Sequence, residues 1–182
     1  MWKKKKSLRS LPEGYQIYER LLKVVGIQYR EDAAHRFARC SRQAIKLDLE
    51  SSNKHDPIAI KVIGISGWSI FKSRRFVGYI PNEVSKQILG SELWGSIKPR
   101  LLRIFTSSTG KVYIEFQIAG PKDKKQQYDD FLMNKPATRK QREFLEYFGR
   151  EKPKGITIGQ AEELIKETRR KMKLKNSETL EN

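Results

Sequence analysis

The chain has 182 residues, enough for one core of ordinary size, and its single cysteine, Cys40, excludes an intrachain disulfide framework and a Cys-rich zinc site. Basic residues exceed acidic ones by 17, a surplus that favours a polyanionic partner. Residues 1–120 hold 22 Lys and Arg against 10 Asp and Glu, so a basic tail does not account for the surplus.

Targeting and membrane signals are missing from the sequence. No apolar run approaches the roughly 20 residues that a membrane-spanning helix needs. The lysines from Lys3 to Lys6 are not followed by the apolar stretch of a secretory signal, so residues 1–14 are interpreted as a flexible basic arm. We expect a cytoplasmic protein without membrane contact, because a lone cysteine suits a reducing compartment.

The first elements in chain order are a strand, a helix and a second strand. Residues 15–18 fit a helix or a strand, and the β-branched run Leu21–Tyr29 predicts a strand. Residues 33–44 predict a helix, since Ala34 and Phe37 recur on one face. Leucines then alternate with charged residues over 47–50, as in a half-buried strand.

A polar corner and two apolar runs occupy the centre of the chain. The corner is Asn53–Pro57, where Asn and Asp can hydrogen-bond their own backbone and proline fixes φ. The runs Ile58–Ile63 and Phe76–Pro81 predict paired strands. Gly78 inside the second run indicates a bulge or a close approach of another backbone segment.

A helix and a hairpin are predicted to complete this domain. Apolar residues recur on one face of Asn82–Leu89, which begins after a proline as helices often do. Ile97–Phe105 and Lys111–Ile118 flank a polar, glycine-containing turn and predict a β-hairpin.

The composition changes after residue 120, and a linker over 121–135 is expected. Beyond it, Thr138 and Thr157 each begin a capping-box pattern, and Gly149 can end the first of two short helices. We therefore expect an α+β fold, with a compact, barrel-like, mainly β domain over 15–120. A two-helix module over 136–171 and a disordered tail over 172–182 are expected to follow.

A catalytic centre is not evident, and we expect neither an enzyme nor a cofactor. The two histidines are His35 and His55, and no motif for nucleotide hydrolysis, zinc proteolysis or serine hydrolysis occurs. The carboxylates of Asp48, Glu50 and Asp56 leave a metal-dependent nuclease as a third hypothesis. A solvated strand face is the simpler interpretation of that cluster.

Basic and aromatic residues are interleaved, a composition that suits single-stranded nucleic acids. Bases stack on aromatic rings and on arginine planes while Lys and Arg neutralise phosphates. The pairs are Tyr29 with Arg30, Lys54 with His55, Lys72, Arg74 and Arg75 with Phe76, and Arg103 and Lys111 with Tyr113. Packing in a core or at a sheet edge is the competing interpretation of Phe76 and Tyr79.

Three segments together resemble a HIRAN domain: Val-Val-Gly-Ile-Gln-Tyr at 24–29, Asn-Lys-His-Asp-Pro-Ile-Ala-Ile at 53–60 and Val-Gly-Tyr-Ile-Pro-Asn-Glu-Val at 77–84. The family typically shows an N-x-x-D-x-x-A-[IV] corner followed by a V/I-G-[YH]-[IL]-P strand end. The resemblance covers about residues 20–118. Residues 136–165 also resemble a two-helix module appended to phage and bacterial DNA-metabolism proteins.

The resemblance implies a compact, mainly β, barrel-like module that occurs alone in bacteria and phages or fused to Swi/Snf-type helicases. In the helicase-linked members it holds the 3′ end of single-stranded DNA. By position, Tyr29 and His55 would stack on terminal bases and Asp56 would accept a hydrogen bond from the 3′ hydroxyl. Two positions depart from that group, since Gln28 replaces a basic residue and Asn82 replaces a lysine.

We therefore expect a nucleic-acid-binding module for single-stranded DNA or its 3′ end, in DNA replication, repair or mobile-element metabolism. The alternative is a non-enzymatic adaptor whose basic face binds a helicase or nuclease. The corner motif also fits a purely structural turn. The residues expected to contact DNA are Tyr29, Arg30, Asn53, Lys54, His55, Asp56, Lys72, Arg74, Arg75, Asn82 and Tyr113.

Overall fold

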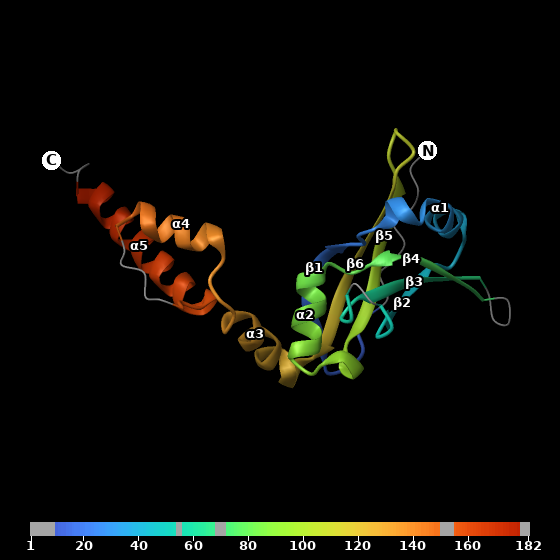
Figure 1. The fold of residues 1–182 in the computed structure, drawn as a ribbon, viewed down its shortest axis with the longest axis horizontal. Helices are drawn as coiled ribbons and strands as arrows, with labels where there is room; N and C mark the ends of the chain where they lie inside the picture. Colours follow the sequence, from blue (N-terminus) through green and yellow to red (C-terminus); the bar gives the residue numbers. More distant parts are fainter. Residues whose placement is uncertain (1–9, 54–55, 68–71, 150–154, 179–182) are drawn as a thin grey trace. The chain divides into compact units, whose positions relative to one another are not determined.

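The computed structural model describes residues 10–53, 56–67, 72–149 and 155–178, with side chains as far as residue 172 in the last helix. The chain divides into two compact units, Met1–Tyr128 and Asp129–Asn182 (Figure 1). The fold is mixed α+β, as expected from the sequence. Strands form most of the first unit, and helices form the second.

The strands of the first unit form two antiparallel three-stranded sheets. One sheet has the order β1 (Tyr15–Lys23), β6 (Val112–Pro121) and β5 (Lys98–Thr106). The other has the order β2 (Ala44–Leu49), β3 (Ile60–Ser66) and β4 (Ser73–Tyr79). Both sheets contribute buried side chains to one hydrophobic core, in which Ile60, Val62 and Phe116 are fully buried.

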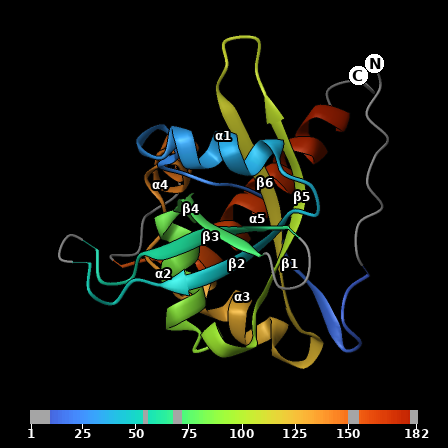
Figure 2. The ribbon, with the colours of Figure 1, turned by 90° about the vertical axis from the view of Figure 1, so that its right-hand side faces the viewer.

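Two helices and three single turns complete the first unit. They are η1 (Ile27–Tyr29), α1 (Glu31–Arg39), α2 (Asn82–Gly90), η2 (Trp94–Ser96) and η3 (Lys122–Lys124). Helix α1 contacts strands of both sheets (Figure 2). Its Phe37 is fully buried, and a Cβ at Gly64 of β3 would lie 2.8 Å from the Phe37 ring, so glycine there lets the helix approach the sheet.

The strand predicted over Leu21–Tyr29 is wrong in its position. The strand is β1, which pairs along β6 and ends at Lys23. Gly26 then takes a φ of 75°, which turns the chain out of the extended conformation, and Ile27–Tyr29 form a helical turn. Beyond Lys23, Val25 forms an isolated bridge to Tyr79 of β4. Tyr29 is therefore the last residue of a helical turn and is not part of a strand.

The helix predicted over 33–44 is α1, which begins at Glu31 and ends at Arg39. Cys40 is extended, and Arg42 has a φ of 53°. The Gln43 side chain donates to the carbonyls of Phe37 and Ala38, at 2.8 and 3.0 Å, and so satisfies acceptors that the helix end leaves open. Strand β2 consequently begins at Ala44, where a longer helix was expected.

The paired strands, the hairpin and the second helix are confirmed with small shifts of their ends. Strands β3 and β4 pair in antiparallel register, and α2 begins at Asn82. Val62 pairs with Gly78 while Ile63 pairs with Phe76, so the chain bulges at Val77. Strands β5 and β6 form the predicted hairpin.

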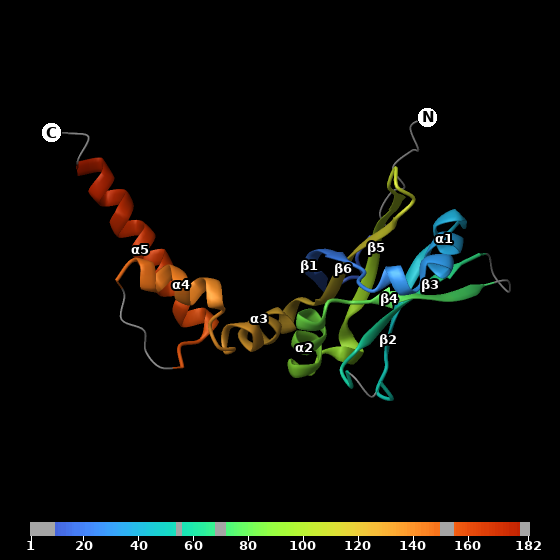
Figure 3. The same ribbon diagram turned by 45° about the horizontal axis from the view of Figure 1, so that its top comes forward.

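The expected linker over 121–135 is largely helical, since η3 is followed directly by α3 (Lys125–Met133). The second unit contains α4 (Arg139–Tyr147) and α5 (Ile158–Glu178), which pack against each other (Figure 3). Both predicted capping boxes are present, with Thr138 bonded to Gln141 and Thr157 bonded to Gln160. The tail expected from residue 172 is wrong as far as Glu178, because α5 continues to that residue.

The domain limits predicted from composition remain a proposal. Among the described residues, no helix is long and apolar enough to span a membrane.

Candidate functional site

The turn after β2 is closed by its own polar side chains. The Asn53 Oδ1 accepts from the backbone N–H of Asp56 at 3.1 Å, and the Asp56 Oδ1 accepts from that of Ile58 at 3.2 Å. Backbone bonds from Glu50 to Ala59 and from Ala59 to Asp56 complete the turn. Such side-chain bonds hold a loop in one conformation. The corner therefore presents Asp56 from a fixed backbone.

Glu50 links the corner to the sheet. Its carboxylate accepts from the Tyr79 hydroxyl at 2.8 Å, the Asn53 Nδ2 at 3.1 Å and the Lys61 Nζ at 3.2 Å. These donors, the Tyr79 hydroxyl above all, hold the pKa of Glu50 below its ordinary range. Burial raises the pKa of Tyr79, and the neighbouring Glu50 carboxylate raises it further. The negative charge of Glu50 is therefore balanced by the Lys61 ammonium and by the other hydrogen-bond donors around it.

Asp56 also reaches the start of α2. Its second oxygen, Oδ2, accepts from the Asn82 Nδ2 at 2.8 Å. Asn82 is the first residue of α2 and is exposed. The two family-like segments at 53–60 and 77–84 therefore meet through this bond, and the Asn82 amide is oriented towards Asp56.

A turn from the N-terminal side brings two further residues to the sheet edge. Val25 and Tyr79 exchange backbone hydrogen bonds of 2.9 and 2.8 Å, which hold the start of the turn that contains Tyr29 against β4. The Arg30 guanidinium lies 4.7 Å from the centre of the Phe76 ring, and that ring meets Tyr79 edge-on at 5.0 Å. Tyr29 is 77% exposed, although aromatic rings are usually packed.

Pairwise contacts link these residues of the first unit, and Tyr29 joins them as the neighbour of Arg30 in sequence; we call the group the corner site. Its members are Tyr29, Arg30, Glu50, Asn53, Asp56, Lys61, Phe76, Tyr79 and Asn82. Sequence reasoning named five of them as contacts, Tyr29, Arg30, Asn53, Asp56 and Asn82. Lys54 and His55 lie outside the described residues.

The other expected contacts lie elsewhere in the first unit. Arg74 lies on the exposed side of β4, whereas Arg75 points to the opposite side and donates to the buried Ser66 hydroxyl at 3.0 Å. Lys72 is exposed just before β4. Tyr113 belongs to the other sheet, where it stacks on Phe105 with 4.9 Å between ring centres. The structure does not join these side chains to the corner site through any contact it describes.

Glu50, Lys61 and Tyr79 were missed as a group. Glu50 was considered as a metal ligand, but its oxygens are engaged by Tyr79, Asn53 and Lys61. Within the described part of the chain, no group of three His, Cys, Asp or Glu is placed to hold a metal ion. The available signal was Lys61, the one charged residue of the apolar run Ile58–Ile63. A lysine in a largely buried strand is expected to pair with a nearby carboxylate, because burying an unpaired charge is costly.

Replacing Glu50 with alanine is expected to lower the free energy of unfolding of the first unit by about 1–3 kcal/mol, because three donors lose their acceptor. The effect should appear as a lower urea midpoint with an unchanged slope. Glu83→Ala, which removes an exposed carboxylate on α2, should stay within about 0.5 kcal/mol of wild type.

The same pair of proteins tests the lowered pKa. A carboxylate whose folded pKa is depressed stabilises the fold above its ordinary pKa of 4.5 and loses this contribution as the pH falls below it. The difference between wild type and Glu50→Ala should therefore shrink on acidification below that value. If the difference in unfolding free energy stays constant through that range, the ionised form of Glu50 is not what stabilises the fold.

Comparison with known proteins gives one similarity in structure. No protein-family model matches the chain, and no curated protein matches it. The structure is similar to the crystal structure of the HIRAN domain of human HLTF, with a TM-score of 0.43 and 15% sequence identity. The similarity covers 67% of this chain and 93% of that chain.

Proposed function

We propose that the first unit is a nucleic-acid-binding module that holds the 3′ end of a single strand at the corner site. The observation that carries the proposal is the placement of Tyr29. Its ring is 77% exposed, and the next residue, Arg30, places its guanidinium 4.7 Å from the centre of the Phe76 ring. Exposed aromatic rings and guanidinium planes are surfaces on which unpaired bases stack.

The charge of the chain supports a polyanionic ligand. The formal net charge is +17, and Arg30 and Lys61 are the cations of the corner site. Lys61 also neutralises Glu50, so the carboxylate closest to the aromatic pair does not stand as an isolated negative charge. In this proposal Arg30 contacts the phosphate. Asn82 cannot form the ion pair, because it has no charge where the helicase-linked HIRAN domains have a lysine.

Asp56 supports recognition of a terminal hydroxyl. An ionised carboxylate has about four acceptor positions, and the described contacts of Asp56 are one bond at each oxygen, from Ile58 and Asn82. The Asp56 carboxylate can therefore accept further hydrogen bonds, and its two donors fix its orientation. A sugar hydroxyl can donate to such a group, whereas a phosphate would be repelled by it.

Asp56→Ala is expected to weaken binding of a strand with a 3′ hydroxyl by roughly 10- to 150-fold, the range for a hydrogen bond to a charged group. Binding of a 3′-phosphorylated strand, weak in the wild type because Asp56 repels the phosphate, should become stronger. Fluorescence anisotropy with labelled strands that differ only at the 3′ end measures both. Asp123→Ala, which removes an exposed carboxylate from η3, is the matched control and should bind like wild type.

The wild type alone can contradict this proposal. Equal affinity for hydroxyl and phosphate ends would rule out end recognition. Thermal unfolding must accompany the comparison, because Asp56 also closes the corner turn. Asp56→Asn, which keeps an acceptor oxygen, separates a loss of folding from a loss of the carboxylate.

A salt titration distinguishes this function from the adaptor alternative. Phosphate contacts give a log–log slope of about −0.7 per contact for single strands. A chain that binds no single strand at low salt, but binds a helicase or nuclease, would be the adaptor.

A further inference from the structure

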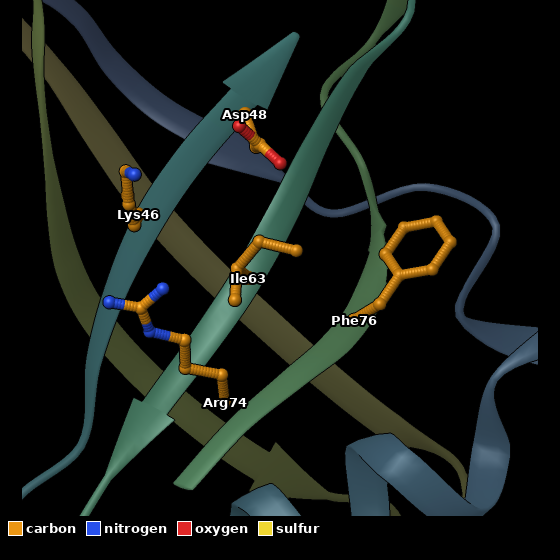
Figure 4. Close-up of a pocket in the computed structure, with 5 residues that line it drawn as sticks. All are labelled: Lys46, Asp48, Ile63, Arg74 and Phe76. Atoms are coloured by element: carbon orange, nitrogen blue, oxygen red, sulfur yellow. The ribbon is translucent and has the colours of Figure 1, made fainter. Parts of the chain in front are cut away.

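The exposed face of the β2–β3–β4 sheet continues beyond the corner site as a shallow groove. It has a volume of about 250 Å³ and is lined by Lys46, Asp48, Ile63, Arg74 and Phe76 (Figure 4). The strand register explains why these residues share one face. Lys46, Ile63 and Phe76 lie side by side across the three strands, and Asp48 pairs with Lys61 in the adjoining row. Of these residues, Arg74 alone was expected to contact DNA.

Asp48 lies at one end of the groove and Arg74 at the other. Asp48 shares its row with Lys61 and Tyr79, so it lies at the end nearest the corner site. At the other end, the Arg74 side chain extends from β4 across β3 towards Lys46 on β2 (Figure 4). Both cations are exposed, and neither forms an ion pair with another residue in the described part of the chain.

The middle of the groove is apolar and joins the corner site. Ile63 and Phe76 are half-buried and face outward, where a strand of a solvated sheet face usually carries polar residues. Phe76 is shared, since its ring also contacts Tyr79 and lies under Arg30. A flat apolar ligand on Ile63 and Phe76 would thus be adjacent to one held at Tyr29 and Arg30.

The ordinary alternative is a solvated basic face, on which isolated lysines and arginines carry no ligand. Three features count against it here. Two cations without an ion pair lie on this face, a half-buried apolar surface lies between Arg74 and Asp48, and that surface is continuous with the Phe76 and Tyr79 pair. A nucleotide combines a planar apolar base with a phosphate in this order.

We propose that this groove binds the nucleotide that precedes the terminal one, an inference that rests on the proposed function. Its base packs on Ile63 and Phe76, and its 5′ phosphate lies between Lys46 and Arg74. With the 3′ end at the corner site and this phosphate beside Arg74, the 5′ side of the strand runs towards Arg74.

The first test removes the phosphate contact. A Lys46→Ala/Arg74→Ala double variant should bind a 3′-hydroxyl hexanucleotide about tenfold or more weakly at low salt. Its log–log salt slope should also be smaller in magnitude by about 0.7. Lys122→Ala/Lys124→Ala removes the same charge from exposed positions of η3 and should retain the wild-type slope.

The second test uses only the wild-type protein, so its result does not depend on whether a variant folds. A hexanucleotide with an abasic residue next to its 3′ nucleotide should bind roughly 5- to 150-fold more weakly than the intact strand, because one stacked base is missing. An abasic residue at the 5′ end should have little effect. Equal affinity for all three strands would contradict the proposal that the groove binds a nucleotide.

The outcomes separate the two proposals. If the wild type binds no 3′-hydroxyl strand, both the proposed function and the proposal for the groove are contradicted. A wild type that prefers hydroxyl ends but shows no abasic effect, with a double variant of unchanged slope, overturns the groove alone. Loss of slope together with the penultimate abasic effect supports both.

Discussion

Replacing Gly78 with alanine is expected to destabilise the first unit by about 3 kcal/mol or more, the largest effect of any exchange considered. Gly78 has a φ of 144°, which side chains with a Cβ rarely adopt. A Cβ there would lie 2.4 Å from the carbonyl oxygen of Val25. That oxygen accepts the 2.8 Å bond from Tyr79 and cannot move away without breaking it.

The same exchange should also impair binding, because the Val25 bond to Tyr79 holds the turn that carries Tyr29 and Arg30 against β4. Gly110→Ala is the matched control. Gly110 has a φ of 82°, but nothing lies within 4 Å of its added Cβ, so only backbone strain of about 1–3 kcal/mol remains. Urea unfolding of both variants measures the difference. Equal costs for the two would show that the close approach at Gly78 is not what destabilises the fold.

Tyr29→Ala is expected to weaken single-strand binding roughly 5- to 150-fold, the range for one stacked base. The fold should lose no more than about 0.5 kcal/mol, since the ring is 77% exposed. Binding and stability therefore separate at this residue, and anisotropy together with thermal unfolding measures both.

The second unit offers the control for Tyr29. Tyr147 is 83% exposed on α4, and its replacement by alanine removes a similarly exposed ring from the other unit. Affinity should then remain that of wild type. A loss on Tyr147→Ala as large as that on Tyr29→Ala would mean that exposed aromatic residues contribute without regard to position.

Strong local patterns were sufficient to predict much of this fold. The alternation of Leu47 and Leu49 and the apolar run after Pro57 led to the correct strands, and the capping boxes at Thr138 and Thr157 led to the correct helix starts. These signals act between residues close in sequence. The same locality explains why the bulge beside Gly78 was foreseen.

Errors arose where a single residue overrides the pattern around it. Gly26 adopts a left-handed conformation and ends the extended run, so Tyr29 is displayed on a turn. Gln43 ends α1 through bonds to carbonyls five and six residues earlier. Neither effect is visible in hydrophobic periodicity.

The corner site was predictable in part. Asn53, Asp56 and Asn82 were singled out, and the bond from Asn82 to Asp56 joins them across 26 positions. Glu50, Lys61 and Tyr79 meet through strand pairing and a long side-chain contact, which depend on register. Arg74 and Arg75 were grouped because they are adjacent, yet neighbours in a strand face opposite sides.

An NMR titration of the full chain with a single-stranded oligonucleotide that carries a 3′ hydroxyl tests the central claim most directly. The account predicts that the backbone amide signals of Tyr29, Arg30, Asn53 and Asp56 shift in proportion to occupancy. Signals of α4 and α5 should stay in place. Shifts confined to α4 and α5, or no shift at the corner site when the chain is saturated with DNA, would contradict it.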